Sequence, residues 1–218
     1  MSGQVAAATS ASKCRCPEGS SRAVGAIVLA AGASRRLGRP KQRLPYRGRS
    51  LLRYAAEQAL AAGCRPVVVV LGAHADELAP LLQGLSVILA RNQSWEEGLS
   101  GSVRLGLEAL ERSRPPVEAA LMLVSDQPLV DASALGRLLA AFQGEATPVV
   151  AAAYSGTLGV PAVFHRSLFP ELRQLRGDQG AKAVILRHRA EVTAVALPEA
   201  ALDVDTPEDW ARIQQGIL

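Results

Sequence analysis

Aromatic residues are scarce in this chain of 218 residues: they make up 4% of it, whereas hydrophobic residues as a whole make up 49%. The core must therefore be built mainly from Ala, Leu and Val. The chain has no run of about 20 apolar residues that could cross a membrane, and residues 1–22 lack the apolar centre of a secretory signal. We therefore expect no membrane association and a cytoplasmic location. Residues 1–22 are expected to form a disordered tail, followed by a single domain over residues 23–218.

Cysteine is also scarce. Cys14 and Cys16 lie in the expected tail, and Cys64 lies in the expected domain. The three cysteines form no Cys-x-x-Cys pattern, and neither they nor the three histidines have the spacing of a zinc site. This pattern argues against a disulfide framework and is typical of a reducing compartment.

Two familiar phosphate-binding patterns are missing as well. The P-loop pattern Gly-x-x-x-x-Gly-Lys-Ser/Thr does not occur, because Gly38 is followed by Arg39 and Pro40. The pattern Gly-x-Gly-x-x-Gly does not occur either. The chain is therefore expected to be neither a P-loop NTPase nor an ordinary dinucleotide-binding dehydrogenase.

What the sequence does contain is a glycine turn followed by many cations. The apolar run at residues 26–31 ends at Gly32, and eight basic residues with no acid follow between Arg35 and Arg53. We call residues 32–41 the glycine loop. Glycine lets backbone N–H groups approach a ligand, and the cations supply countercharge, so this segment predicts a polyphosphate site. The alternative is an exposed basic loop. Because the patch is short and has few aromatic residues for stacking on bases, no nucleic-acid partner is expected.

Strand-like apolar runs alternate with helix-like segments along the chain. Strands are expected at residues 26–31, 67–71, 86–90, 119–125 and 149–153. Helices are expected at residues 51–62, 75–82, 102–112 and 133–142. In the last third of the chain, the pattern is less regular and predicts a hairpin or edge strand at 159–164, a helix at 181–188, a strand at 192–197 and a closing helix at 207–214. This alternation predicts an α/β fold, with a mainly parallel sheet covered on both faces.

A carboxylate is expected on the same edge of the sheet as the glycine loop. Ligands of open α/β sheets bind beyond the carboxyl ends of the strands, and Asp126 directly follows the strand at residues 119–125. A carboxylate placed there suits Mg²⁺, which binds one or two carboxylates together with phosphate oxygens. The alternative role for Asp126 is to cap the helix that starts near Ser133, although Asp131 is closer to that helix.

A second acidic cluster lies at residues 203–209. Thr206 before Pro207 predicts a helix N-cap with proline at the first position. Asp203 and Asp205 remain, and one of them could complete the Mg²⁺ site. Because alternate strand positions point to opposite faces, we expect only one to do so, and we prefer Asp205.

The loop at residues 92–102 combines small residues, a tryptophan and hydroxyl groups just before a helix. Ser100 and Ser102 could donate hydrogen bonds to a base or a phosphate. The alternative is that one of these two serines caps the helix, and both roles are compatible.

Five motifs in order give the chain a family resemblance. They are Leu29-Ala-Ala-Gly32-Ala-Ser-Arg-Arg36-Leu-Gly38-Arg-Pro-Lys41, Asn92-x-x-Trp95-x-x-Gly98, Asp126-Gln-Pro128, Gly177-Asp178-x-Gly-Ala-Lys182 and Asp203-x-Asp205-Thr-Pro-Glu-Asp209. Together they resemble the MobA-like nucleotidyltransferase family, and within it the molybdenum cofactor cytidylyltransferase group. The resemblance covers nearly all of the chain beyond the tail.

The resemblance implies a three-layer α/β/α, Rossmann-like nucleotidyltransferase fold of the GT-A type. It also implies Mg²⁺ as cofactor, CTP as nucleotide and molybdopterin, a phosphorylated pterin, as acceptor, with transfer of CMP and release of pyrophosphate. The sequence Ala30-Ala31-Gly32 resembles the cytidine-using branch, whereas the guanylyl-using branch usually has Ala-Gly-Gly. A molybdoenzyme or its chaperone would then receive the product.

The resemblance also assigns roles to individual residues. Arg36, Lys41 and Asp126 are the expected catalytic residues, and Asp126 with Asp205 or Asp203 is the expected metal site. Asp178 and Lys182 are expected to contact the second substrate, although Asp178 could instead cap a helix that begins near residue 180. The expected nucleotide-binding residues are Leu29, Ala30, Ala31, Gly32, Ser34, Arg35, Arg36, Lys41, Gly98 and Ser102.

Other functions remain open at this point. The same fold could serve GTP, or an acceptor such as a sugar phosphate, methylerythritol phosphate or phospholactate. A protein of another class would hold a nucleotide or pterin without catalysis and pass it to a partner enzyme.

Overall fold

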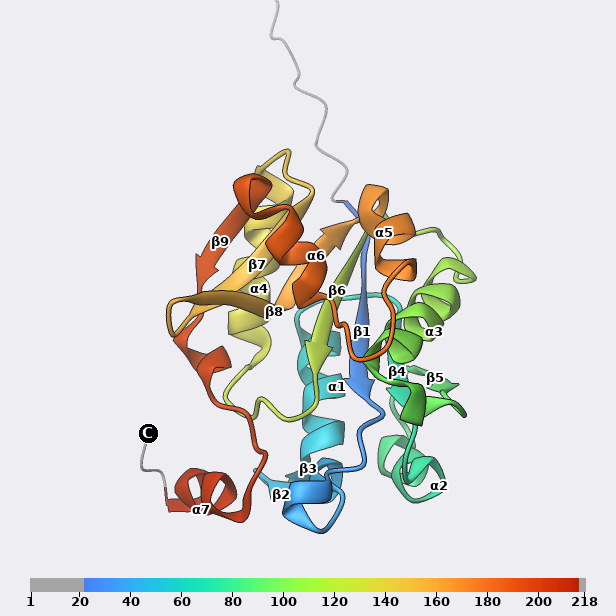
Figure 1. The fold of residues 1–218 in the computed structure, drawn as a ribbon, viewed down its shortest axis with the longest axis vertical. Helices are drawn as coiled ribbons and strands as arrows, with labels where there is room; N and C mark the ends of the chain where they lie inside the picture. The colour runs from blue at the N-terminus through green and yellow to red at the C-terminus, as the bar shows by residue number, and fades with distance from the viewer. Residues whose placement is uncertain (1–21, 216–218) are drawn as a thin grey trace, which may run out of the picture.

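One seven-stranded sheet runs through the part of the chain that the computed structural model describes, residues 22–215 (Figure 1). Its strands lie in the order β5-β4-β1-β6-β8-β7-β9. Their bounds are β1 (Val24–Ala30), β4 (Val67–Leu71), β5 (Ile88–Arg91), β6 (Ala119–Val124), β7 (Val149–Tyr154), β8 (Thr157–His165) and β9 (Val192–Ala196). A separate two-stranded ribbon, β2 (Pro45–Tyr46) and β3 (Arg49–Ser50), follows the glycine loop.

The sheet is mainly parallel, as the sequence predicts. Strands β5, β4, β1 and β6 run parallel to one another, and β9 runs parallel to β7. Strand β8 alone is antiparallel to both of its neighbours, β6 and β7. Strands β1, β4 and β6 end at one edge, because Leu29 lies opposite Val124 and Ala30 lies opposite Leu71.

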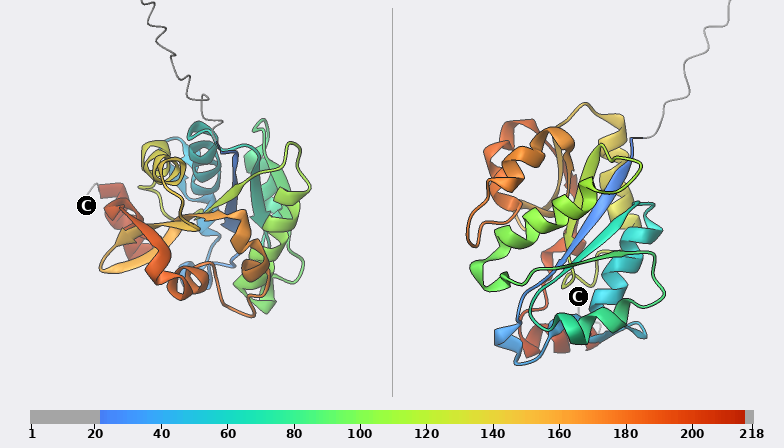
Figure 2. Two further views of the ribbon diagram at one scale, coloured as in Figure 1. Left: turned by 90° about the horizontal axis from the view of Figure 1, so that it is seen from above. Right: turned by 90° about the vertical axis from the view of Figure 1, so that its right-hand side faces the viewer.

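Helices cover both faces of the sheet, which gives the predicted three-layer α/β/α architecture (Figure 2). On one face, α1 (Leu51–Ala61) and α4 (Ala132–Gly144) bury apolar side chains such as Leu52 and Phe142. On the other face, α3 (Leu99–Glu111), α5 (Phe169–Arg173) and α6 (Lys182–Arg187) bury Leu107, Leu172 and Ile185. The short helix α2 (Ala75–Leu78) and the C-terminal helix α7 (Pro207–Gln215) lie toward the carboxyl ends of the strands (Figure 1).

Side-chain caps fix where several helices begin. The Ser50 hydroxyl accepts from the Arg53 N–H at 3.2 Å at the start of α1, and the Asp131 carboxylate accepts from the Ala134 N–H at 2.8 Å at the start of α4. Such caps satisfy N–H groups that have no partner within the helix.

Strand β8 contains residues 159–164, for which the sequence predicts either a hairpin or an edge strand. The predicted hairpin is confirmed, because β7 and β8 pair across a tight turn, with Tyr154 opposite Thr157. The alternative of an edge strand is wrong, since β8 lies between β6 and β7. Both of its faces are covered, so Ala162, Val163 and Phe164 are all fully buried and the strand lacks an alternating pattern.

Several helix bounds also differ from the prediction. Helix α3 begins at Leu99 rather than at Ser102, and α5 was not predicted because it is short and contains Pro170. Helix α2 ends at Leu78, and a 3₁₀ turn with Pro80 replaces the rest of the predicted helix at residues 75–82.

Most of the predicted tail, residues 1–21, lies outside the described residues. Arg22 belongs to the fold instead, because its guanidinium donates to the carbonyls of Gln143 and Glu145 at 3.0 and 2.9 Å and lies over the Phe142 ring. Within residues 22–215, no helix is both long enough and apolar enough to span a bilayer.

Two helical glycines should respond to alanine in opposite directions. A Cβ on Gly106 of α3 would lie 2.5 Å from Cγ2 of Ile27, so Gly106→Ala should lower the free energy of unfolding by about 1–3 kcal/mol. Gly136 of α4 has open space around the same position, so Gly136→Ala should raise the free energy of unfolding by about 0.5–1 kcal/mol. Urea unfolding of the two variants checks this, and effects of the same sign would contradict the packing of α3 on β1.

His188 should make the stability depend on pH. Hydrogen bonds to Glu171 at 2.6 Å and Glu191 at 3.1 Å raise the pKa of His188 above its usual 6.5. The stabilisation is therefore complete below pH 6.5 and is lost as the pH rises through the raised folded-state pKa. His188→Gln should cost about 0.5 kcal/mol more at pH 6 than at pH 9, the scale of an accessible ion pair. Equal losses at both pH values, measured by urea unfolding, would contradict this.

Candidate active site

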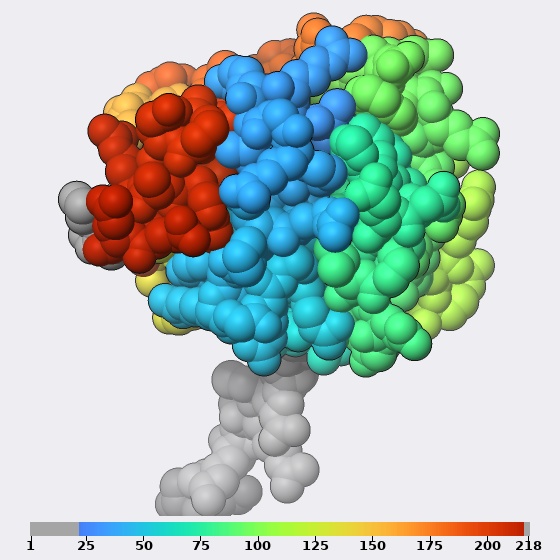
Figure 3. Space-filling view, turned by 90° about the horizontal axis from the view of Figure 1, so that it is seen from below, coloured from blue at the N-terminus to red at the C-terminus, as the bar shows by residue number. Residues whose placement is uncertain are grey.

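The carboxyl ends of β1 and β6 bring two of the predicted site segments together. β1 ends at Ala30 and β6 ends at Val124, so the glycine loop starts beside Asp126. The C-terminal segment joins them, because the Val204 N–H donates to the Asp126 carbonyl at 2.9 Å. Figure 3 shows this face of the molecule, with the segment after β1 (blue) between the C-terminal segment (red) and the segment that holds α2 (green).

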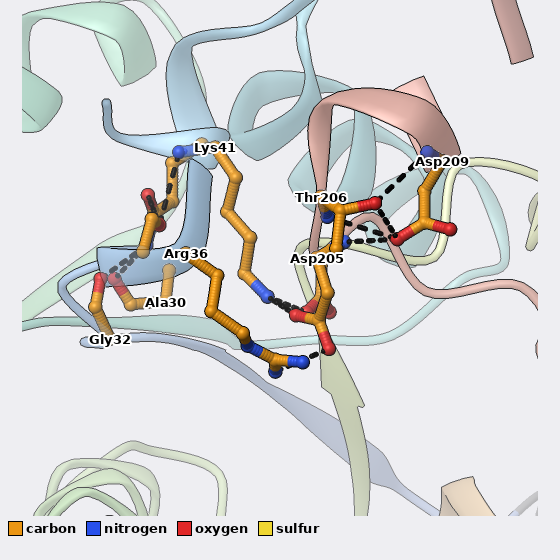
Figure 4. Close-up of polar contacts among 10 residues, drawn as sticks. Ala30, Gly32, Arg36, Lys41, Asp205, Thr206 and Asp209 are labelled. Atoms are coloured by element: carbon orange, nitrogen blue, oxygen red, sulfur yellow. Dashed lines mark hydrogen bonds and ion pairs between the residues drawn. The ribbon is translucent and has the colours of Figure 1, made fainter. Parts of the chain in front are cut away.

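The Lys41 side chain pairs with two carboxylates, and Figure 4 shows it extended toward Asp205. Its ammonium group forms an ion pair with Asp126 and a second one with Asp205, at 2.8 Å. The Lys41 and Asp126 side chains are only 16% exposed, whereas Asp205 is 34% exposed. The Arg36 guanidinium bonds to the other oxygen of Asp205 at 2.7 Å and is itself 71% exposed. Arg36 and Lys41 of the glycine loop thus form one charged cluster with Asp126 and Asp205, which lie far from the loop in the sequence.

The charges in this cluster stabilise one another. Burial alone would lower the pKa of the Lys41 ammonium, but the Asp126 and Asp205 carboxylates outweigh burial and raise this pKa above 10.5. Burial alone would raise the pKa of Asp205, but Lys41 and Arg36 outweigh it and lower this pKa below 3.8. Lys41 and Asp205 are therefore both charged at neutral pH.

Asp126 has one oxygen that is left without a partner in the described part of the chain. Its Oδ1 atom is buried, and no group of residues 22–215 forms a hydrogen bond with it. Asp126 does not cap α4, since Asp131 does so. A buried carboxylate oxygen without a donor fits a cation ligand, because leaving it unpaired is unfavourable.

The two candidate partners of Asp126 differ in their surroundings. Asp205 contacts the cations Lys41 and Arg36. Asp203 is exposed as a whole residue, but partial burial of its carboxyl group and the negative charge of Asp126 raise the pKa of Asp203 to about 6. Among residues 22–215, no group of three or more His, Cys, Asp and Glu side chains is placed to hold a metal ion. A cation held by Asp126 and one of these two aspartates would therefore take its other ligands from phosphate and water.

The short segment that carries Asp205 is fixed by the cap of α7. The Thr206 hydroxyl accepts from the Asp209 N–H at 3.2 Å, and the Asp209 carboxylate accepts from the Thr206 N–H at 2.9 Å (Figure 4). This reciprocal pair confirms the predicted N-cap at Thr206. It also places Asp205 directly before a rigid helix start.

A cleft of about 410 Å³ lies beside the charged cluster. The predicted nucleotide-binding residues that line it are Ala31, Gly32, Arg35, Gly98 and Ser102, together with Ala33, Trp95, Glu96, Leu99 and Asp178. The charged cluster is not part of this lining. Most of the predicted site residues therefore fall into two groups, the charged cluster and the cleft lining, which meet at the glycine loop.

One wall of the cleft depends on close contact between two glycines. A Cβ on Gly98, whose φ is 106°, would overlap the backbone of Gly177 and lie 2.7 Å from the Asp178 nitrogen. The Ser100 N–H also donates to the Gly177 carbonyl at 3.0 Å. Asp178 is held against the start of α3 and does not cap α6, whose N-cap is Ala181.

The serines of the 92–102 loop do not cap a helix. Gly98 is the N-cap of α3, so the capping alternative for Ser100 and Ser102 is wrong. Both serines are buried, and the Asn92 side chain donates to the Ser102 hydroxyl at 3.0 Å. Lys182, the other residue expected at the second substrate, is exposed at the start of α6.

The first three residues of the first motif are buried. Leu29, Ala30 and Ala31 are at most 8% exposed, and their carbonyl groups accept from Ser125, Gln42 and Ala73, respectively. Leu29 and Ala30 do not line the cleft. Their contribution is to place the glycine loop.

Sequence reasoning missed Gln42. This side chain is 1% exposed, and its amide donates to the carbonyls of Ala30 and Gly32 at 3.2 and 2.9 Å. The signal that could have revealed it is a neutral amide among eight basic residues, placed directly after Lys41.

Comparison with known proteins agrees with this geometry. The model of the MobA-like NTP transferase domain matches residues 26–192. Nicotine blue oxidoreductase of Paenarthrobacter nicotinovorans is 34% identical over 86% of this chain and 94% of its own length. The purine catabolism protein PucB of Bacillus subtilis (strain 168) is 28% identical over 88% of this chain and 96% of its own length.

Solved structures share the fold. Rv0371c from Mycobacterium tuberculosis H37Rv is 29% identical, with a TM-score of 0.76 over 90% of this chain and 100% of its own. A complex of the same protein with manganese has a TM-score of 0.70 over 88% of this chain and 98% of its own. A nucleotidyl transferase from Methanothermobacter thermautotroptrophicus, 22% identical, is alike in fold, with a TM-score of 0.74 over 89% of this chain and 97% of its own.

The family match spans the glycine loop, both walls of the cleft and Asp126, and the relatives cover nearly the whole length of the chain. This protein therefore belongs to the MobA-like NTP transferase domain family, which implies a nucleoside triphosphate as substrate.

Proposed function

We propose that this protein transfers CMP from CTP to the phosphate of molybdopterin and releases pyrophosphate. The observation that carries the proposal is the charged cluster of Arg36, Lys41, Asp126 and Asp205 beside the glycine loop. Such a set of cations and carboxylates suits phosphoryl transfer, in which positioning and charge neutralisation do most of the work. The choices of CTP and molybdopterin are supported by the resemblance of residues 29–41 and 177–182 to the cytidylyltransferase group.

The reaction needs no protein base. An oxygen of the acceptor phosphate attacks the α-phosphorus of CTP, and a new P–O bond forms. The bond from the α-phosphorus to the bridging oxygen breaks, and its electron pair leaves with pyrophosphate. A phosphate monoester is already largely dianionic near neutral pH, because its second pKa is about 6, so no proton has to be removed.

The residues of the charged cluster would neutralise the phosphates. Arg36 is 71% exposed and is the group of the cluster that is most accessible to an incoming ligand. Lys41 would exchange a carboxylate for a phosphate oxygen of the nucleotide. Arg36 and Lys41 already balance the charges of Asp126 and Asp205. A bound triphosphate would therefore need further positive charge, which Arg35 of the cleft and a divalent cation would supply.

Asp126, with Asp205 or Asp203, would hold Mg²⁺. The buried and unpaired Oδ1 of Asp126 supports this assignment, and so does the manganese in the structure of the Mycobacterium tuberculosis relative. When bound, the ion would neutralise and orient the phosphates. The ribose and base would lie in the cleft near Gly98 and Ser102, with Asp178 and Lys182 toward the second substrate.

We also propose the wider setting that the sequence suggests. The protein would act in the cytoplasm as a single domain over residues 23–218 behind a tail. A molybdoenzyme or its chaperone would receive the product. There are three alternatives: transfer from GTP, transfer to another phosphorylated acceptor, and binding of a nucleotide or pterin without catalysis. A panel of nucleotides and acceptors separates them.

One comparison favours a second candidate function. The relative with 34% identity is named nicotine blue oxidoreductase, so the cleft of this chain would instead hold a substrate for a redox reaction. The absorbance of nicotine blue, followed with oxidised and with reduced nicotinamide cofactors, tests this. A redox reaction of nicotine blue without pyrophosphate release from any nucleotide would favour this function over nucleotidyl transfer.

Pyrophosphate release should occur with CTP, Mg²⁺ and molybdopterin together, and should be weak with GTP or ATP.

Lys41→Ala should lower kcat/KM by about 30- to 1,000-fold, which is about 2–4 kcal/mol of lost transition-state stabilisation. Asp126→Ala should abolish the Mg²⁺-dependent turnover while leaving the fold intact by circular dichroism. Release with GTP alone would overturn the nucleotide assignment, and undiminished activity of Asp126→Ala would overturn the metal assignment.

Lys41→Met should strengthen metal binding when no nucleotide is present. The ammonium group now pairs with both carboxylates, so its removal leaves Asp126 and Asp205 available to a cation. The Kd for Mn²⁺ alone, measured by electron paramagnetic resonance, should fall by about tenfold or more. Arg43→Met is the control, because Arg43 pairs with the exposed Glu77 instead. An unchanged Kd in Lys41→Met would place the metal elsewhere.

A further inference from the structure

Gln42 connects the two ends of the glycine loop. Its amide group donates to the carbonyl of Ala30, the last residue of β1, and to the carbonyl of Gly32, the first residue of the loop. Its Oε1 atom lies 3.3 Å from the Ser34 hydroxyl, which donates to it. Figure 4 shows Ala30 and Gly32 with these hydrogen bonds. A single buried side chain therefore holds the end of β1 and two positions of the glycine loop.

These contacts determine where the loop N–H groups point. A trans peptide directs its C=O and its N–H to opposite sides. Because the carbonyls of Ala30 and Gly32 point to Gln42, the N–H groups of Ala31 and Ala33 point away from Gln42. Both alanines line the cleft, and a Cβ placed on Gly32 would meet nothing within 4 Å. The two carbonyl groups therefore face Gln42, and the Ala31 and Ala33 N–H groups lie on the opposite side of their peptides.

Gln42 is also linked to Lys41 through Ser34. Ser34 has a φ of 53°, a left-handed conformation that is unfavourable for a residue with a side chain. The Ser34 hydroxyl accepts from the Lys41 N–H at 3.1 Å while it donates to Gln42. The loop conformation and the backbone position of Lys41 therefore depend on the same small network.

We propose that Gln42 is the positioning residue of the nucleotide loop, which keeps two carbonyl groups turned away from the cleft and aims the Ala31 and Ala33 N–H groups at an anionic ligand. The ligand class is a triphosphate, and this part of the inference rests on the proposed function. Without the amide of Gln42, the Gly32 carbonyl oxygen loses its donor and the Gly32–Ala33 peptide is free to rotate, whereas Ala30 is still held by its pairing with β4. A rotated peptide presents a carbonyl oxygen to the phosphates and repels them.

Two substitutions separate this role from simple packing. Gln42→Glu keeps the shape of the side chain but replaces its donor with an acceptor, opposite two carbonyl oxygens. Gln42→Leu keeps an apolar fill and removes all three hydrogen bonds. Gln58→Leu is the matched control, because the Gln58 side chain accepts from the Ala132 N–H at 2.9 Å, far from the loop in sequence and on the α1–α4 side.

The first readout is nucleotide binding. The Kd for CTP with Mg²⁺, measured by calorimetry, should rise by about tenfold or more in both Gln42 variants and stay within about twofold of the unmodified protein in Gln58→Leu. In turnover, the KM for CTP should rise more than kcat falls, because the loop binds the phosphates both before and during the reaction. Unchanged CTP affinity in Gln42→Glu would overturn the proposal.

The second readout needs no nucleotide, so it separates this inference from the proposed function. Hydrogen exchange of residues 31–41, followed by mass spectrometry, should be faster in both Gln42 variants than in the unmodified protein and in Gln58→Leu. If the unmodified protein binds no CTP, the proposed function fails, and faster exchange still supports the positioning role. Exchange at the unmodified rate in both Gln42 variants would overturn it.

Discussion

The ion pairs of the Lys41 ammonium group join three segments that are far apart in the sequence. Lys41 belongs to the glycine loop after β1, Asp126 follows β6, and Asp205 precedes α7. Lys41 reaches Asp126 because β1 and β6 are parallel neighbours that end at the same edge of the sheet. The Val204 N–H, which donates to the Asp126 carbonyl at 2.9 Å, brings Asp205 to the same place. The chemistry proposed for the site depends on this constraint, since it gathers both signs of charge at one place.

The division of the site into two parts also has a physical basis. The charged cluster neutralises itself in the absence of a ligand, so its groups remain partly buried without an uncompensated charge. The neighbouring cleft is lined by small residues, an indole and three charged side chains, and the contact between Gly98 and Gly177 shapes one of its walls. The glycine loop lies between the two parts and contributes to both. A nucleotide that lies across the loop would place its phosphates in one part and its base in the other.

Much of this arrangement could be predicted from the sequence because it follows from local pattern. The alternation of apolar runs and helical segments predicts the parallel sheet, and the position of Asp126 after a strand predicts its place on the edge beside the glycine loop. The Thr206 cap has its own sequence signature. These features need only a few neighbouring residues to be recognised.

The rest depends on contacts between distant residues. The interior position of β8 comes from its pairing with β6, and the backbone contact of Gly98 with Gly177 moves the start of α3 to Leu99. Gln42 gains its importance only when the loop folds back over its amide, which no periodicity reveals.

A crystal structure with CTP and Mn²⁺, with the metal located by its anomalous scattering, tests the central claim most directly. The account predicts a manganese peak at Asp126 together with Asp205 or Asp203, and a triphosphate along the glycine loop in contact with Lys41. A peak at another place, or a triphosphate that avoids the loop, would contradict the account.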